Sequence, residues 1–414
     1  MNNTSLGYHT FSVFREMTSE NYAKLCHDFK EYSQYDTDMK GYPSKTNDKG
    51  YTAWEYAHQE NKGIRWKLSS RVINIKGSKT PYCKRMVEAI INPRTLLENN
   101  YITAATAADI SNVETLFNEQ ACDISDKLRS FQDYSANRID YCLNIDLAEL
   151  GYPCTPQQLM QLVKKGNIPP HFSERKEYSP TGHRFVTDSS SFYLESSSVT
   201  INYYLKNAQM TEKHPNYQNK DKSENVIRFE VQCKSKKLNE MWNTYSELLN
   251  VKENFFFFGR NKGRIPILPM LSDQIVQTVV EDYFCKVVGM GHYLTFKEAC
   301  DVIDSYNFMN KTKRQLKRTL EIIRDNKGIA RTREKIYESI DNQGDTNAMI
   351  VFNKALRELD NLMINPVTIP ENWNIKWIPN PMWAYKIRHD PSEEFLRKSC
   401  DALEHMHIKI NCMK

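Results

Sequence analysis

The chain has 414 residues, of which 40% are hydrophobic and 26% charged, and its formal net charge is +5. These values indicate a globular protein that is long enough for two or three domains, each with its own core. The mildly basic balance permits a nucleic-acid partner but does not require one. No stretch approaches the roughly 18 consecutive apolar residues of a membrane span, so we expect no membrane partner.

Targeting and redox features indicate a cytoplasmic protein. The first residues, MNNTS, lack the positive n-region and the apolar h-region of a signal peptide. Ten cysteines are scattered along the chain, from Cys26 to Cys412, without a CxxC pair. This distribution is typical of reduced cysteines, and it favours neither a disulfide framework nor a zinc site.

The first half of the chain alternates expected strands with expected helices. In chain order these are a strand (8–14), a helix (19–32), a polar loop (34–50), one or two strands (64–77), a strand (86–91), a helix (112–128), a strand (138–146), a helix (156–165), a strand (199–206), an exposed insertion (207–225), a strand (227–233) and a helix (238–249). Strands are recognised by their period of two and helices by their period of 3.6. The order predicts an α+β fold for residues 1–255, with a central antiparallel sheet and flanking helices.

The second half is mostly helical. We divide it into a linker and connecting helix (256–290), a helix-turn-helix or winged-helix-like DNA-binding domain (291–364), and a strap rich in proline and tryptophan followed by a C-terminal helix (365–414). The second of these segments contains two short helices, 294–306 and 312–325, with a brief turn between them. This is the pattern of a helix-turn-helix, and we expect residues 328–333 to form the wing.

Three of the expected strands place polar side chains on one face. Alternation in residues 199–206 puts Tyr203 with the apolar side chains and Tyr204 with the polar ones. The polar faces of the three strands carry Asp140, Asn144 and Asp146; Asn202, Tyr204 and Lys206; and Arg228, Glu230 and Gln232. If the strands share one sheet in one orientation, these groups suit a metal-assisted phosphoryl transfer to tyrosine. A solvated sheet face without catalytic groups is the alternative.

Short motifs in these strands resemble those of a known family. Arg138-Ile139-Asp140, Tyr204-Leu205-Lys206 and Arg228-Phe229-Glu230 follow one another in this order. They resemble the "RID … YxK … RFE" signatures of the replication initiation factor family, which comprises rolling-circle replication initiators of plasmids and filamentous phages and related relaxases. Ile91-Asn92-Pro93-Arg94 is also similar to a segment of that group. The resemblance covers roughly residues 8 to 250, and it implies a catalytic nicking domain at 1–255 of a plasmid- or phage-encoded protein in the bacterial cytoplasm.

The resemblance implies Tyr204 as the nucleophile. Its phenol would attack a backbone phosphate of DNA, leaving a free 3′-hydroxyl and a 5′-phosphotyrosine link. Tyrosine titrates near pH 10, so a neighbouring group must stabilise the phenolate, and Lys206 is the candidate. Arg228 would hold a phosphate with two parallel hydrogen bonds. Tyr203 is the rival nucleophile, although its parity in the strand places it in the core.

The resemblance also implies a divalent metal, Mg²⁺ or Mn²⁺. Asp140 and Glu230 are the expected ligands and Asp146 the weaker third, because hard cations prefer carboxylate oxygens. Many rolling-circle initiators carry a His-hydrophobic-His metal motif. The only such triplet here is His405-Met406-His407, near the C-terminus and outside any expected strand. The chain therefore resembles the class that lacks this motif.

A one-signed basic run follows the expected turn of the helix-turn-helix. The residues that we expect to bind DNA are Lys311, Lys313, Arg314, Lys317, Arg318, Lys327, Arg331 and Arg333. Leu316, Leu320 and Ile323 form the apolar stripe of the helix, so most of these cations would face outward. The pattern is typical of a recognition helix meeting phosphates. An ordinary basic surface helix is the alternative.

The expected function is initiation of rolling-circle replication by a metal-dependent, strand-specific DNA endonuclease. The expected partners are double-stranded origin DNA and the nicked single strand, with a host helicase and polymerase. A conjugative relaxase with the same chemistry and a non-catalytic DNA-binding regulator of the same fold are the alternatives. The chain contains no GxxxxGK[ST] phosphate loop, so we expect no ATPase activity.

Overall fold

The fold is described from a computed structural model of the chain. It describes residues 3–44, 52–58, 62–73, 82–98, 100–175, 177–178, 185–186, 190–245, 265–343, 347–389 and 391–408. The predicted domain boundary at residue 255 lies outside these residues. None of the described helices is both long enough and apolar enough to cross a membrane.

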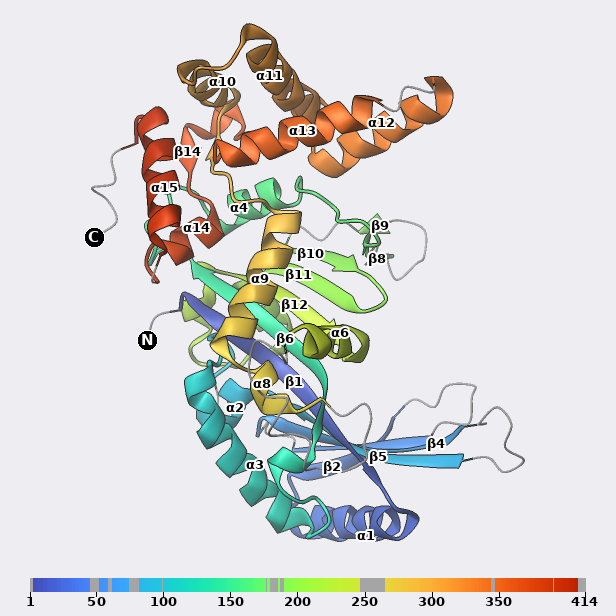
Figure 1. The fold of residues 1–414 in the computed structure, drawn as a ribbon. Coiled ribbons are helices and arrows are strands. Elements are labelled where there is room, and N and C mark those ends of the chain that lie inside the picture. The colour runs from blue at the N-terminus through green and yellow to red at the C-terminus, as the bar shows by residue number, and fades with distance from the viewer. Residues whose placement is uncertain are drawn as a thin grey trace.

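The central antiparallel sheet that the sequence predicted organises the molecule, and it has ten strands (Figure 1). From one edge to the other its strands are β2 (Met39–Ser44), β3 (Thr52–His58), β4 (Ile64–Ile73), β5 (Tyr82–Ile91), β1 (Ser5–Met17), β6 (Ser135–Asp146), β12 (Val226–Lys234), β11 (Val199–Leu205), β10 (Ser191–Glu195) and β7 (Ser173–Glu174). Two strand pairs lie apart from it, β8 (Glu177–Tyr178) with β9 (Phe185–Val186) and β13 (Tyr293–Leu294) with β14 (Trp377–Ile378). The long strands β1 and β6 lie in the middle, and the hydrogen bonds between them join the two halves of the sheet.

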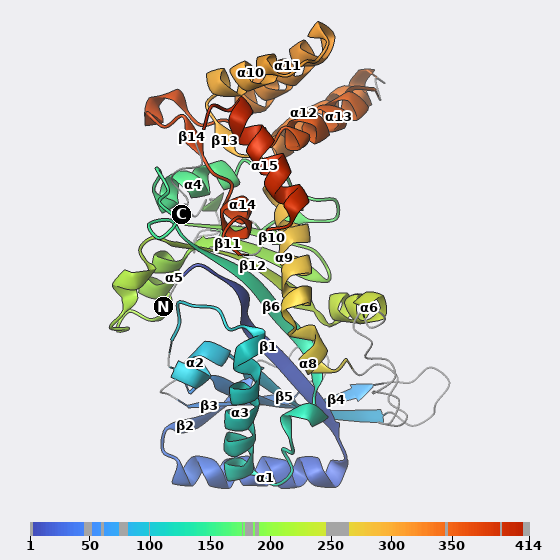
Figure 2. The same cartoon turned by 60° about the vertical axis from the view of Figure 1, so that its left-hand side comes forward.

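Helices cover the apolar face of this sheet (Figures 1 and 2). The covering helices are α1 (Ser19–Tyr35), α3 (Ile110–Ile124), α4 (Pro156–Val163), α6 (Ser235–Tyr245) and α9 (Asp273–Val287). Beneath α1 and α3, the rings of Phe29, Trp66 and Phe117 follow one another with centroid separations of 6.0 and 5.2 Å. Beneath α9, Phe284 meets Phe229 of β12 at 5.2 Å. The apolar alternation of the strands therefore builds one core along the whole sheet.

The remaining elements around the sheet are short helices in the segments that connect its strands and helices. They are α2 (Pro93–Glu98), η1 (Ala107–Asp109), η2 (Phe131–Asp133), α5 (Lys206–Lys213), η3 (Lys220–Ser223) and α8 (Ile267–Met270). Residues 207–225, predicted as an exposed insertion, thus contain a helix. Met210 of α5 is fully buried, and the polar composition around this single apolar anchor hid the helix from the pattern.

The C-terminal region is helical, as predicted. It comprises α10 (Phe296–Ser305), α11 (Asn310–Asp325), α12 (Ile329–Gln343), α13 (Asn347–Asn361), η4 (Glu371–Trp373), α14 (Pro381–Lys386) and α15 (Glu393–His405). The prediction of a wing at residues 328–333 is wrong, because α12 begins at Ile329. Gly328, with a φ of 147°, ends the preceding turn, and the buried Ile329 and Thr332 then start an amphipathic helix instead of a hairpin.

The polar loop predicted at 34–50 also needs correction. Residues 39–44 form the edge strand β2, paired with β3. Pro43 is compatible with an edge position, since an edge strand leaves one row of backbone N–H groups without a ladder partner. The buried Met39 of this strand and Tyr56 of β3 belong to the core beside Phe29.

Candidate active site on the polar face of the sheet

The three strands that carry the motifs are neighbours in the sheet, in the order β6, β12 and β11. Their antiparallel register aligns three cross-strand rows: Asn144–Arg228–Tyr204, Cys142–Glu230–Asn202 and Asp140–Gln232–Thr200. Residues paired across strands point to the same face. The condition set by the sequence pattern is therefore met, and Asp140, Tyr204, Arg228 and Glu230 lie on one face of the sheet.

This face is not open to solvent at the motif residues, so the alternative interpretation of a solvated sheet face does not hold for them. Tyr204 is 5% exposed, and Arg228 and Lys206 are 0% and 1% exposed. The segment from residue 100 to 105 crosses this end of the face, and the backbone oxygen of Ile102 accepts hydrogen bonds from Arg228 and from Asn144. Lys206, expected as the last residue of the strand, is instead the first residue of α5.

Glu230 is the centre of the hydrogen-bonding network on this face. Tyr204 donates from its hydroxyl to Oε2 of Glu230 at 3.2 Å, and Nδ1 of His9 lies 3.2 Å from the same oxygen. Asn202 donates to Oε1 at 3.3 Å. A carboxylate, a phenol, an imidazole and an amide from three strands thus meet at one point. Arg228 is the cross-strand neighbour of Tyr204. Its guanidinium, however, is buried and donates to Asn144 at 2.6 Å and to the backbone oxygen of Ile102, so it is not free to hold a phosphate with two parallel hydrogen bonds as expected.

Together, burial and the charges of this cluster lower the pKa values of Glu230 and His9 and raise that of Tyr204. Burial alone would raise the pKa of Glu230, but the hydrogen bond from His9 and the charges of Arg228 and Lys206 lower it to about 2. Burial raises the pKa of Tyr204 well above its usual range, and the nearby Glu230 adds to this. Burial and the Arg228 charge lower the pKa of His9 to about 4. At neutral pH the site therefore holds a carboxylate, a neutral imidazole and a protonated phenol.

Lys206 lies next to the tyrosine but does not bond to it in the structure. Its Nζ donates to Gln209 at 2.6 Å and lies 5.9 Å from the centre of the Tyr204 ring. Burial, followed by the charge of Arg228, lowers the pKa of Lys206 well below its usual value. Tyr203, the rival nucleophile, is 1% exposed on the apolar face, 5.8 Å from the ring of Phe229.

The three expected metal ligands are not brought together. Asp140 lies one row from Glu230, whereas Asp146 pairs with Val226, about 13 Å from the Glu230 row at 3.3 Å per residue. Oδ1 of Asp146 accepts from the backbone N–H groups of Ala148 and Glu149, so this carboxylate caps the turn after β6. Across the described residues, no three His, Cys, Asp or Glu side chains form a group that could hold a metal ion.

Asp140 differs from the other two carboxylates. Its Oδ2 accepts from Arg138 at 3.1 Å, while its Oδ1 is buried and has no hydrogen-bond partner among the described residues. Burial raises the pKa of Asp140 to about 7, against the opposing charge of Arg138 and with the added repulsion of Glu230. A cation at Oδ1 would relieve this uncompensated burial. The donor chemistry of Asp140 and Glu230 therefore fits a hard divalent ion that takes its remaining ligands from phosphate and water.

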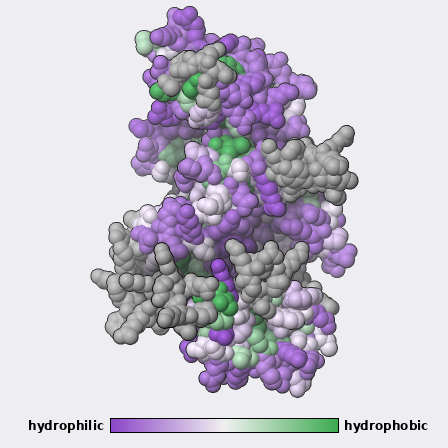
Figure 3. Space-filling view, turned by 90° about the vertical axis from the view of Figure 1, so that its right-hand side faces the viewer, coloured by the Kyte–Doolittle hydropathy of each residue, from purple (hydrophilic) through white to green (hydrophobic). Residues whose placement is uncertain are grey.

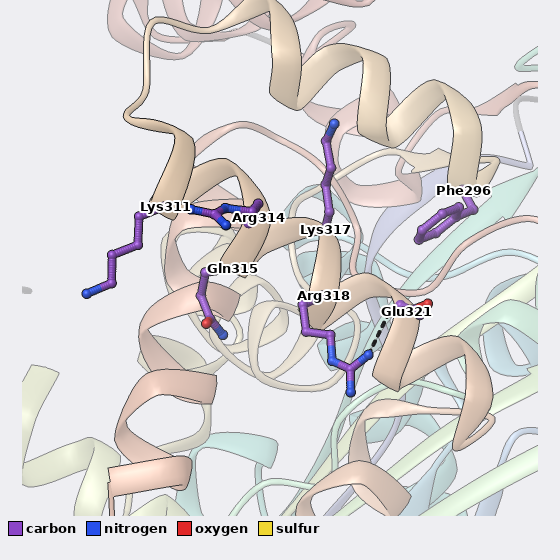
Figure 4. A pocket seen from close by; sticks show the side chains of 7 residues that line it. All are labelled: Phe296, Lys311, Arg314, Gln315, Lys317, Arg318 and Glu321. Atoms are coloured by element: carbon purple, nitrogen blue, oxygen red, sulfur yellow. Dashed lines mark hydrogen bonds and ion pairs between the residues drawn. The ribbon is translucent and has the colours of Figure 1, made fainter.

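The expected DNA-binding residues divide into two groups. Along α11, an open pocket of about 560 Å³ is lined by Phe296, Lys311, Arg314, Gln315, Lys317, Arg318 and Glu321 (Figure 4). Lys311, Arg314 and Arg318 are exposed on one side of the helix. Lys317 is tied to Asp304 at 2.5 Å. The surface over the C-terminal helices is largely hydrophilic in the view of Figure 3.

The other residues of the expected set are less suited to DNA. Lys313 donates to the backbone oxygen of Asp304 at 2.7 Å. Arg333 is half-buried, and it donates to Asn167 at 3.0 Å and to Asn353 at 2.6 Å, which makes it an internal link of the fold. Lys327 and Arg331 are exposed but lie beyond the end of α11.

Sequence patterns missed His9, which touches Glu230. The residue lies at a β-bulge of β1, where the register against β6 shifts between Tyr8 and Thr10. A bulge breaks the period of two, so alternation alone could not assign the side chain to a face. The His405-Met406-His407 triplet takes no part in this site, since the ring of His405 stacks on Tyr306 at 3.7 Å.

Comparisons with known proteins leave the family open. No known protein family and no curated protein matches the chain by sequence. A solved structure of a rolling circle replication initiator protein from Geobacillus stearothermophilus aligns with a TM-score of 0.26 and 12% identity, over 56% of this chain and 74% of that chain. A TM-score this low carries no argument, so the function rests on the residues of the chain itself.

Proposed function

We propose that the chain nicks one strand of origin DNA and thereby starts rolling-circle replication. The observation that carries the proposal is the contact between Tyr204 and Glu230, made on the sheet face where the three motif strands meet. This arrangement holds the hydroxyl of a tyrosine against a hydrogen-bond acceptor at 3.2 Å, with the guanidinium of Arg228 on the neighbouring strand. These are groups that a tyrosine-linked phosphoryl transfer needs.

Tyr204 would attack a backbone phosphorus through its phenolic oxygen. The new bond joins the tyrosine to the 5′-phosphate, and the bond from phosphorus to the 3′-oxygen breaks, so that a proton completes a free 3′-hydroxyl. Glu230 accepts the hydrogen bond of the phenol and so orients its oxygen, and the phenol proton passes to water as the new bond forms, because a carboxylate with a pKa of about 2 does not retain it. Arg228 counteracts the burial that raises the pKa of Tyr204, because a cation next to a phenolate stabilises it.

Asp140 and Glu230 are the residues that would hold a divalent metal. Bound Mg²⁺ or Mn²⁺ polarises a scissile phosphate and offsets the charge of the transition state. Two protein carboxylates are enough, because Mg²⁺ is usually bound by one or two carboxylates together with water and substrate phosphates. The unpartnered Oδ1 of Asp140 supports this assignment. Asp146 has no place in it, since it caps a turn.

The DNA strand would approach the same polar face at its other end, away from residues 100–105. Asn202, Gln232 and His9 are partly exposed there, whereas Arg228 and Tyr204 are covered. The helix α11 would hold duplex origin DNA through Lys311, Arg314 and Arg318, as expected of a recognition helix. A host helicase would unwind the duplex, and a host polymerase would extend the freed 3′-end.

The test is a nicking assay with supercoiled DNA of the replicon that encodes the chain, with and without Mn²⁺. The proposal expects conversion to the open circle only with the metal, together with a protein–DNA adduct that survives denaturation. Mass spectrometry should place the nucleotide on Tyr204. Binding without nicking or adduct, at every metal concentration, would leave only a DNA-binding protein.

A further inference from the structure

His9 enters the site because β1 contains a β-bulge. Tyr8 pairs with Tyr141 and Thr10 with Asp140, so His9 is an extra residue on β1. The bulge keeps Tyr8 and Phe11 in the core, with ring centroids 6.0 Å apart. It also turns the side chains of His9 and Thr10, which lie between them, toward the polar face. Bulges beside active sites commonly re-aim a side chain in this way.

The contact of His9 with Glu230 spans a whole strand. β1 and β12 lie on either side of β6, about 10 Å apart at the usual strand spacing. The residue of β6 paired with Glu230 is Cys142, whose small side chain leaves room for the two longer ones to meet. Nδ1 of His9 and Oε2 of Glu230 lie 3.2 Å apart. Because a carboxylate only accepts, Nδ1 is the donor.

Glu230 has few other restraints at this oxygen. Its Oε2 accepts from His9 and Tyr204, and Asn202 holds the other oxygen at the longer distance of 3.3 Å. The side chain of His9 is 20% exposed and that of Glu230 only 7%, so the imidazole is the more accessible of the two groups. Removal of the imidazole would leave the carboxylate free to rotate away from the phenol.

We propose that His9 is a positioning residue, which holds Glu230 in the orientation that both the Tyr204 phenol and a divalent metal require. The inference rests on the proposed nicking function. Hydrogen-bonding partners of metal ligands orient them, and their loss typically costs 10–100-fold in metal affinity or activity. We therefore expect a loss of about that size when the donor is removed, with DNA affinity unchanged.

Two variants distinguish the hydrogen bond that His9 donates from the volume that its side chain fills. His9→Leu keeps bulk in the bulge and removes the N–H, whereas His9→Asn keeps an N–H near the position of Nδ1. We expect His9→Leu to lower kcat of nicking about 10–100-fold, without a change in KM for a labelled single-stranded origin oligonucleotide. The His9→Asn variant should recover most of the loss. His27→Leu, on the exposed histidine of α1, is the matched control.

A second measurement does not depend on turnover. Mn²⁺ is titrated into each protein with the oligonucleotide present, and the EPR signal of the free ion reports binding. His9→Leu should weaken Mn²⁺ binding and His9→Asn should restore it, while circular dichroism shows both to be folded. Equal Mn²⁺ affinity and equal kcat in wild type and His9→Leu overturn the inference, as does an Asn variant no better than Leu. Absence of nicking by the wild type contradicts the proposed function instead.

Discussion

Adjacent tyrosines of β11 face opposite sides of the sheet, and their hydroxyl groups meet different surroundings. The hydroxyl of Tyr204 donates to Glu230, whereas that of Tyr203 is buried without a hydrogen-bond partner among the described residues. An unsatisfied buried hydroxyl costs stability, and a satisfied one contributes about 1 kcal/mol. The two phenols are thus distinguished by energetics as well as by direction.

Phenylalanine at each position tests this difference. Tyr204→Phe should fold, lose about 1 kcal/mol of unfolding free energy with its hydrogen bond, bind origin DNA and form no covalent adduct. Tyr203→Phe should nick normally and be as stable as the wild type or more stable. Urea unfolding and denaturing gels of a cleaved, labelled oligonucleotide measure both effects. An adduct on Tyr203, or on any other residue, would contradict the assignment.

The two carboxylates of β6, Asp140 and Asp146, should also differ in their effect on nicking. Asp140→Ala removes a buried oxygen that has no hydrogen-bond partner among the described residues and that we propose as a metal ligand. We therefore expect nicking to be abolished and DNA binding to persist. Asp146→Ala is the matched control: it removes the cap of the turn after β6 and should cost about 1 kcal/mol of stability, while nicking continues. Nicking at wild-type rates by Asp140→Ala would remove this residue from the proposed metal site.

At the scale of elements, the sequence predicted strands and helices where the apolar periodicity is regular, and it missed features where the periodicity is interrupted. The strands around Asp140, Tyr204 and Glu230 alternate without a break, and the structure places them side by side, which the prediction from sequence had only assumed as a condition. His9 escaped because the bulge in β1 shifts the register. No local pattern reports that the segment around Ile102, distant in the chain, would cover the polar face. That covering depends on tertiary packing alone.

The same distinction applies to α11 and α12. The stripe of Leu316, Leu320 and Ile323 predicted α11, and these residues are buried. The next helix carries many charged residues, and some of its contacts, such as those of Arg333 with Asn167 and Asn353, are polar. The apolar residues that pack α12 on the core, Ile329, Ile336 and Ile340, are widely spaced. Only the first of them lies in residues 328–333, so this stretch looked like a wing.

The exposed side of α11 gives a prediction about salt. Replacement of Lys311, Arg314 and Arg318 together by Ala should weaken origin binding and reduce the slope of log affinity against log salt by about 0.9 for each phosphate that the variant no longer neutralises. Fluorescence anisotropy at several salt concentrations measures the slope. Lys30, Arg397 and Lys398, exposed cations of α1 and α15, form a control triple that should leave the slope unchanged. Identical slopes for both triples would make α11 an ordinary basic helix.

At the scale of the whole molecule, the two predicted halves share packing. The helix α9, assigned from sequence to a linker and connecting helix, buries Val280, Phe284 and Val287 in the core of the sheet. The start of α12 is bonded to the connection after α4, with the N–H of Ile329 donating to the oxygen of Lys165 at 2.9 Å. One apolar cluster runs from the sheet to α14, so we expect the sheet and the C-terminal helices to unfold together.

Trp383 on α14 tests this coupling. Its ring is fully buried, and its Nε1 donates to Ser399 at 2.9 Å. Trp383→Ala should cost about 3–5 kcal/mol of unfolding free energy. If the core is shared, this loss appears as faster amide hydrogen exchange in β6 and β12, since their protection reports global unfolding. Trp54→Ala, at a ring 44% exposed on β3, should change neither strand. Faster exchange confined to α14 and α15 would instead show that the C-terminal region unfolds by itself.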